Sequence, residues 1–134
     1  MFQNSTQRRN LQLKLVRENV KVRAGVRKAF AALRKNEHLL CKMNFACCMS
    51  CACAELSPIV DDEKKKGAVY FHRQDNAAFN ETGKLSIRYF TRTDSQDCKK
   101  LGELIVQYMT ENGVETKWDG NPTRTIEVGR FKND

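Results

Sequence analysis

Apolar residues recur at helical spacing through the first quarter of the chain. Val22, Val26 and Leu33 share one face and no proline interrupts the segment, so the pattern predicts a helix over residues 10–35. Residues 1–9, which precede this helix, are expected to be flexible. The chain therefore begins with one long predicted helix.

A second, shorter helix is predicted around a run of cysteines. It extends from Phe45 to Leu56, is rich in alanine and cysteine, and is expected to be mostly buried. Because proline disfavours helical backbone at the residue before it, Ser57 and Pro58 are expected to end this helix. The charged residues 61–66 follow as a solvated connector.

Strand patterns begin in the middle of the chain. Residues 68–72 contain aromatic and β-branched side chains, and residues 84–90 alternate between apolar and polar, which places Leu85 and Ile87 on one face. We expect these two strands to pair. The polar residues 76–83 between them are predicted to form a turn-like connection.

The last third of the chain predicts a helix and a hairpin. Residues 93–95 supply candidate N-caps for the helix, and Gly113 marks its end. Residues 114–118 and 125–128 are predicted to form a terminal β-hairpin around a turn at residues 119–122.

These elements predict an α+β fold. Two N-terminal helices would be followed by a ββαββ unit, giving a small, mostly antiparallel sheet with helices packed on it. With 134 residues, 40% of them apolar and 30% charged, the chain is predicted to form a single domain over residues 1–134. Its core would be the cysteine-rich helix plus the ββαββ unit, residues 44–130. No run approaches the roughly 18 apolar residues of a membrane span, and no secretory signal begins the chain, so we expect a cytoplasmic protein.

Positive charge is concentrated in the first predicted helix. The net charge is +8, and residues 1–35 carry ten lysines and arginines against the single acid Glu18. Much of this charge lies opposite the apolar face, so the helix is basic and amphipathic. The residues expected to bind an anionic partner are Lys14, Arg17, Lys21, Arg27, Lys28, Arg34 and Lys35.

We interpret this helix as the binding surface of a non-enzymatic interaction or regulatory protein. Its partner would be nucleic acid or an acidic protein surface, because both present negative charge to the helix. The alternative is a merely solvated face. Phosphate-binding, dinucleotide-binding and His-Glu-x-x-His motifs are absent from the sequence, which disfavours the common nucleotide enzymes and metalloproteases.

Five of the six cysteines lie between Cys41 and Cys53. The spacing of Cys48 and Cys51 lets one turn present two sulfurs to a zinc ion, and the further candidate ligands are Cys47, Cys53 and His72. Three other interpretations remain: a redox-active pair, a cysteine nucleophile served by His72 with Asp75 or Glu55, and tight core packing of small side chains. A zinc- or thiol-dependent activity at this cluster is therefore the alternative function.

Three short segments together resemble a known family. Residues 45–51 have the sequence Phe-x-Cys-Cys-x-x-Cys, residues 72–75 have His-x-Gln-Asp, and residues 118–120 have Trp-Asp-Gly. In this combination the chain, over roughly residues 10–130, resembles a family of uncharacterised bacterial proteins that is a domain of unknown function. The resemblance implies no activity. Besides the cysteines and His72, it points to the polar residues Gln74, Asp75 and Asp119.

Overall fold

The part of the chain that the structure describes contains four helices and five strands, which alternate except for the last two strands. The structure is a computed structural model and describes residues 5–92, 98–129 and 131. The elements in chain order are α1 (Ser5–Glu37), β1 (Leu40–Lys42), α2 (Met49–Asp62), β2 (Gly67–Tyr70), α3 (Arg73–Thr82), β3 (Lys84–Thr91), α4 (Cys98–Glu111), β4 (Glu115–Lys117) and β5 (Ile126–Gly129). The predicted α+β class is confirmed.

The strands form one mixed sheet in the order β1-β2-β3-β5-β4. β1 runs parallel to β2, and the other three pairings are antiparallel. The predicted pairing of the two middle strands is confirmed, with Tyr70 opposite Arg88. The predicted terminal hairpin is also confirmed, since β4 pairs antiparallel with β5.

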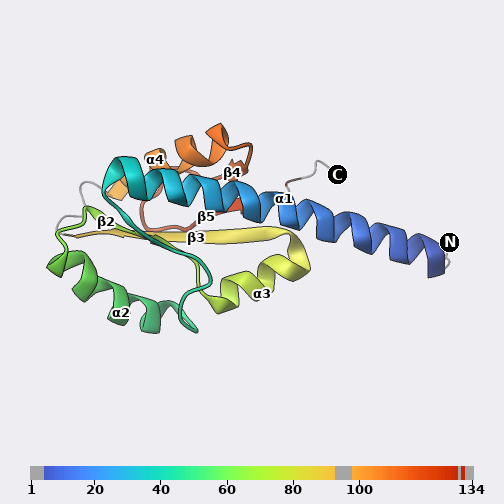
Figure 1. Ribbon diagram of the computed structural model, residues 1–134, viewed down its shortest axis with the longest axis horizontal. Helices are drawn as coiled ribbons and strands as arrows, with labels where there is room; N and C mark the ends of the chain where they lie inside the picture. Colours follow the sequence, from blue (N-terminus) through green and yellow to red (C-terminus); the bar gives the residue numbers. More distant parts are fainter. Residues whose placement is uncertain (1–4, 93–97, 130, 132–134) are drawn as a thin grey trace.

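Helices cover both faces of this sheet (Figure 1). α1 and α4 lie above the sheet in that view, and α2 and α3 lie below it. Leu85 and Ile87 point into the larger cluster, as the alternation along β3 predicts. That cluster also takes Val26, Ala29, Phe30 and Leu33 from α1 and Leu101, Ile105 and Met109 from α4. A smaller cluster lies between α2 and the sheet and contains Ala52, Leu56, Val60, Ala68 and Tyr70.

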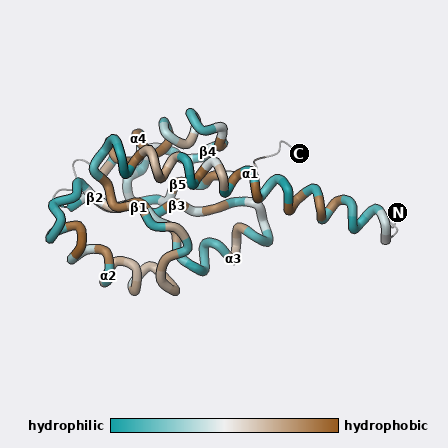
Figure 2. The backbone as a smooth tube through the Cα atoms, in the orientation of Figure 1, coloured by the Kyte–Doolittle hydropathy of each residue, from teal (hydrophilic) through white to brown (hydrophobic). Residues whose placement is uncertain are grey.

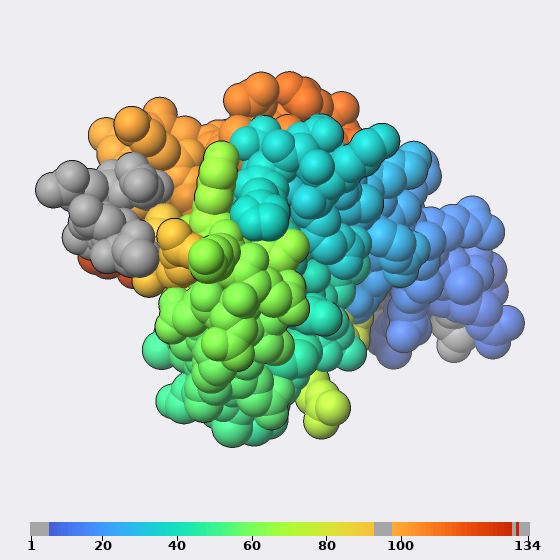
Figure 3. Space-filling model, turned by 60° about the vertical axis from the view of Figure 1, so that its left-hand side comes forward, coloured from blue at the N-terminus to red at the C-terminus, as the bar shows by residue number. Residues whose placement is uncertain are grey.

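The N-terminal half of α1 projects beyond the sheet (Figure 1) and stands clear of the remaining surface (Figure 3). Hydrophobic and hydrophilic residues alternate along it (Figure 2). Leu11, Leu13, Val16 and Val20 are 47–59% exposed there, which is high for large apolar side chains. Within the described residues, no helix has both the length and the apolar content needed to cross a bilayer.

The observed order of elements differs from two N-terminal helices followed directly by ββαββ. α1 extends beyond the predicted range at both ends, so residues 5–9 are helical, while residues 1–4 lie outside the described part. The short strand β1 separates α1 from α2. The candidate caps at residues 93–95 also lie outside the described residues.

The largest correction concerns residues 76–83, where the predicted turn is the greater part of helix α3. His72 and Asp75 form a reciprocal capping box at its start, and Gly83 ends it with a left-handed φ of 77°. Phe79 anchors this polar helix because its ring is fully buried. One buried aromatic side chain in ten residues is too sparse to show helical periodicity in the sequence.

Pro58 does not end α2, which continues to Asp62. Leu56 and Val60 lie on either side of the proline and are both buried, so packing holds the helix through it. The expectation that Pro58 is a terminator was therefore wrong. Tertiary burial outweighed the local backbone preference.

Close packing between α4 and the turn after β4 fixes the end of the sheet. A Cβ on Gly102 would lie 2.5 Å from Cη2 and 2.6 Å from Cζ2 of Trp118. The indole in turn packs edge-on against Tyr89, with ring centroids 6.4 Å apart, and its Nε1 donates to the carbonyl of Asn121 at 3.0 Å. Trp118 thus connects α4, β3 and the β4–β5 turn.

We predict that Gly102→Ala destabilises the protein by about 1–3 kcal/mol, because the methyl group overpacks the indole by more than the helix gains from alanine. The measurement is urea unfolding followed by the fluorescence of Trp118, the only tryptophan of the chain. Glu103→Ala, at an exposed position of the same helix, is the control and should change stability by less than about 0.5 kcal/mol. Equal stability of the two variants would contradict the packing argument.

Candidate metal centre

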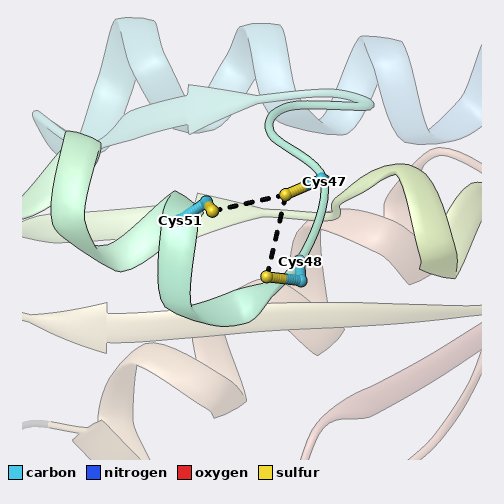
Figure 4. Close-up of side chains that lie close together, drawn as sticks. All are labelled: Cys47, Cys48 and Cys51. Carbon is cyan, nitrogen blue, oxygen red and sulfur yellow. Dashed lines mark hydrogen bonds between the residues drawn. The ribbon is translucent and has the colours of Figure 1, made fainter.

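Three cysteines converge where the chain leaves β1 and enters α2. Cys47 lies in the connecting loop, Cys48 is the N-cap residue of α2, and Cys51 lies in its first turn. Asn44 and Ala46 have φ values of 50° and 63°, so the loop turns sharply at two left-handed residues. This reversal brings Cys47 back beside the start of the helix (Figure 4).

Backbone hydrogen bonds hold this loop against the end of β2. The N–H of Phe45 donates to the carbonyl of Phe71 at 3.0 Å, and the N–H of Arg73 donates to the carbonyl of Ala46 at 3.0 Å. Both bonds cross between segments about 26 residues apart in sequence. The cysteine loop is therefore positioned by the sheet and does not depend on α2 alone.

The three sulfurs lie at distances suited to one metal ion. The Sγ atom of Cys47 is 3.8 Å from that of Cys48 and 3.3 Å from that of Cys51 (Figure 4), and all three lie within 4.8 Å of one another. Tetrahedral zinc with bonds of about 2.3 Å places its sulfur ligands about 3.8 Å apart. Small side-chain adjustments would therefore complete a three-sulfur site. Among the described residues, no second group of three or more His, Cys, Asp or Glu ligand atoms meets the same limit.

The thiols of the cluster differ in acidity. The pKa of Cys48, at the start of the helix, is lowered mainly by the backbone N–H of Cys51 and, to a smaller extent, by the thiols of Cys47 and Cys51. No side-chain hydrogen bond caps the helix at this residue. Hydrogen bonding to Cys47 and then to Cys48 raises the pKa of Cys51 to about 11. Cys48 is thus the favoured thiolate, and a metal ion must displace the proton of Cys51.

The remaining cysteines have other surroundings. Cys53 is half-buried on α2, with its Sγ atom 3.5 Å from the hydroxyl of Tyr70. Burial raises the pKa of Cys41 to about 12, so this core thiol stays protonated. Cys98 lies half-buried near the carbonyl of Pro122, and burial raises its pKa as well.

His72 is a helix cap in this structure and does not join the sulfur group. Its side chain is 3% exposed, and its Nδ1 accepts the backbone N–H of Asp75 at 3.2 Å. That bond uses an unprotonated Nδ1. The Oδ2 atom of Asp75 lies 3.3 Å from the same nitrogen, but burial has the larger effect and lowers the pKa of His72, which favours the neutral imidazole. Of the five candidate ligands, the structure brings together Cys47, Cys48 and Cys51, and places Cys53 and His72 elsewhere.

Asp75 lies at the centre of a buried polar network. Its carboxylate accepts from Nε of Arg88 at 2.9 Å, from Nη2 of Arg88 at 3.0 Å and from the backbone N–H of His72 at 3.2 Å. Gln74 is exposed, and Asp119 accepts the N–H of Asn121 within the β4–β5 turn at 2.9 Å. Asp75 and Asp119 therefore each stabilise the local backbone.

The seven candidate cations of α1 are all exposed. Arg34 also donates from Nη1 to the carbonyl of Cys41 at 3.4 Å. α1 lies above the sheet in Figure 1, whereas the sulfur group lies at the start of α2, below the sheet. The basic residues and the cysteine cluster are thus two separate surfaces.

Sequence reasoning missed Arg88, the partner of Asp75. It occupies a polar position in the alternating pattern of β3, which is also the pattern of an ordinary solvated strand residue. Nothing local in the sequence indicates that a carboxylate thirteen residues earlier would fix its guanidinium group.

A family model described as "Domain of unknown function (DUF6891)" matches residues 24–133. The match includes the three clustered cysteines and Asp75 but begins after the projecting half of α1. No curated protein and no solved structure matched the chain.

We predict that the free energy of unfolding decreases as the pH falls below about 6.5, because burial lowers the pKa of His72 despite the nearby carboxylate of Asp75. The unfolded chain then binds a proton that the folded chain resists, so stability is complete above the usual histidine pKa and lost in acid, at up to about 1.4 kcal/mol per pH unit.

The measurement is urea unfolding at several pH values between about 7.5 and 5. His72→Asn keeps a side-chain acceptor at the N-cap and should flatten the profile. His38→Asn is the matched control at the only other histidine; His38 is exposed, and asparagine tolerates its left-handed φ of 55°. Profiles that coincide for wild type and His72→Asn would refute the assignment.

Proposed function

We propose that this chain, which belongs to the DUF6891 family of domains of unknown function, is a metal-binding protein that holds a zinc ion through Cys47, Cys48 and Cys51. One observation carries the proposal: three sulfurs lie within 4.8 Å of one another at the start of α2. Thiolates are soft ligands that favour zinc over the hard cations magnesium and calcium. The site needs no rearrangement of the fold, because the loop is already held against β2.

Three thiolates leave the fourth zinc position open. Structural zinc sites are closed by four protein ligands, whereas catalytic sites keep one position for water or substrate. Cys47 and Cys51 are exposed, so the open position would face solvent. We therefore propose an exchangeable fourth ligand, supplied by water or by a bound molecule.

A second candidate function is binding of an acidic protein surface through α1. Its supporting observation is the combination of exposed cations with exposed Leu13, Val16 and Val20 on the projecting half of the helix. Phosphates would engage the cations but would leave these apolar side chains in water. An acidic amphipathic helix would bury the apolar side chains and pair with the flanking charges, so it is the favoured partner over nucleic acid.

We predict that the protein, purified under reducing conditions without added metal, contains about one zinc ion per chain. Cys51→Ser should weaken zinc binding by more than about 100-fold, because it removes a direct ligand. Loss of a residue that only hydrogen-bonds to a ligand typically weakens metal binding by up to roughly 100-fold. The measurements are elemental analysis against protein concentration and titration with a competing chelator.

Cys53→Ser provides the matched control, since it removes a thiol from the same helix outside the sulfur group. It should bind zinc as the wild type does. Equal zinc affinity in both variants would contradict the proposal. A metal-free protein in which Cys47 and Cys51, 3.3 Å apart, oxidise reversibly to a disulfide would instead support the thiol-dependent alternative.

For the second function, we predict that a synthetic acidic helical peptide with a leucine stripe binds the protein and that binding weakens between about 50 and 300 mM salt. The double substitution Leu13→Ser/Val16→Ser keeps every charge and should weaken binding about tenfold, because it removes apolar burial. Fluorescence anisotropy of the labelled peptide measures both effects.

Lys100→Gln, at an exposed lysine of α4, controls for non-specific loss of charge and should leave the affinity nearly unchanged. A duplex RNA of similar charge is the competing probe. If the RNA bound more tightly than the peptide and the double substitution had no effect, the partner would be nucleic acid and the acidic-protein proposal would be wrong.

A further inference from the structure

A groove opens between α2 and the turn that joins β4 to β5, next to the cysteine cluster. Its volume is about 150 Å³. The lining side chains used below are Met49 and Cys53 from α2, Tyr70 from β2, Arg88 from β3 and Arg124 from the turn. Segments far apart in sequence therefore meet around one small space.

Arg88 is fixed in this groove by Asp75. Two of its nitrogens, Nε and Nη2, bind both carboxylate oxygens at 2.9 and 3.0 Å, which sets the plane of the guanidinium group. The third nitrogen, Nη1, has the Sδ atom of Met49 as its contact at 3.6 Å. A thioether is a weak acceptor, so this charged donor is available to a better one.

The Tyr70 hydroxyl is a second donor in the groove. Burial is the main cause that raises the pKa of Tyr70, and contact with the thiol of Cys53 is the next. The phenol therefore keeps its proton at neutral pH. Its contact there is the Sγ atom of Cys53 at 3.5 Å, which is another weak hydrogen-bonding group. A stronger acceptor in the groove would therefore improve the hydrogen bonding of Tyr70.

Arg124 supplies a second positive charge from the opposite wall. Its side chain is 71% exposed, and its ion pair with Asp119 is loose at 3.9 Å. The turn that carries it is held in place because Tyr89 donates its hydroxyl to the carbonyl of Arg124 at 2.9 Å. The guanidinium group of Arg124 can thus reach a ligand while its backbone stays fixed.

We infer that this groove binds a small molecule through a carboxylate or phosphate group. Arg88 would be the fixed anchor, with Tyr70 and Arg124 as additional donors. Among the described residues that line the groove, two are arginines and none carries a carboxylate. The volume matches that of a cavity known to admit a benzene-sized molecule, which suits an oxyanion of roughly four to six heavy atoms.

This inference goes beyond the proposed zinc site and does not require it. Met49 follows the N-cap residue Cys48 directly, so the groove begins beside the sulfur group, but neither arginine is one of the sulfur ligands. An anion bound here would lie close to the metal centre. The two proposals can still be tested separately, because zinc-free protein retains every donor of the groove.

The test is a titration of metal-free, reduced, ¹⁵N-labelled protein with inorganic phosphate and, separately, with acetate, at constant ionic strength. We expect saturable shifts of the Arg88 Nε–H signal and of the amides of residues 123–125 with at least one probe. The preferred probe identifies which oxyanion group the groove takes. Arg124→Gln should weaken binding about tenfold, because a charge-assisted hydrogen bond is lost at a position too exposed to disturb folding.

Lys100→Gln, at an exposed lysine of α4 outside both proposed binding surfaces, is the control and should leave the affinity unchanged. Arg88→Lys is the second variant; it keeps the charge but loses the fork geometry, and should also weaken binding. The inference is overturned if neither probe gives saturable shifts below about 10 mM, which corresponds to a very weak affinity. Shifts that map to α1, or that are equal in Arg124→Gln and Lys100→Gln, would overturn it as well.

Discussion

The rest of this structure depends on the hydrogen bonds and the ion pair that compensate the buried carboxylate of Asp75. That carboxylate is 6% exposed, and such a charge is tolerated only when hydrogen bonds and an opposite charge compensate it. Asp75 obtains both, from the backbone N–H of His72 and from the guanidinium group of Arg88. One side chain thereby starts α3, ends the extended segment after β2 and orients a cation on β3. Removing it would leave Arg88 uncompensated and His72 without its reciprocal cap.

That arrangement also determines where the chemistry of the molecule gathers. The face of the sheet toward α1 and α4 is filled by apolar side chains, whereas the opposite face carries Tyr70 and Arg88 beneath α2. The cysteine loop is hydrogen-bonded to the end of β2, one residue before His72. The sulfur group, the capping network and the groove therefore share one region of the fold.

Much of this fold is predictable from the sequence because its pattern is local. The helical spacing of α1 and the alternation along β3 each lie within one segment, and both predictions agree with the structure. β1 was missed because a three-residue strand has too little pattern to detect and exists through its pairing with β2. α3 was missed because Phe79 is its single large buried anchor, although the capping pair His72 and Asp75 and the terminal Gly83 were visible signals.

The same distinction applies to the candidate site. Cys47, Cys48 and Cys51 are close in sequence, so their grouping follows from loop and helix geometry that spacing can suggest. Long-range contacts cannot be predicted from spacing in this way. Cys53 lies in the same alanine- and cysteine-rich segment as the other three, yet its contact is the hydroxyl of Tyr70, seventeen residues away. The family match also distinguishes between the candidate sites. It covers the sulfur group and Arg88 but begins at residue 24. The exposed apolar and basic residues of the projecting helix precede that point. Metal and anion binding would therefore be properties of the matched domain, whereas partner binding through α1 would depend in part on residues that precede it.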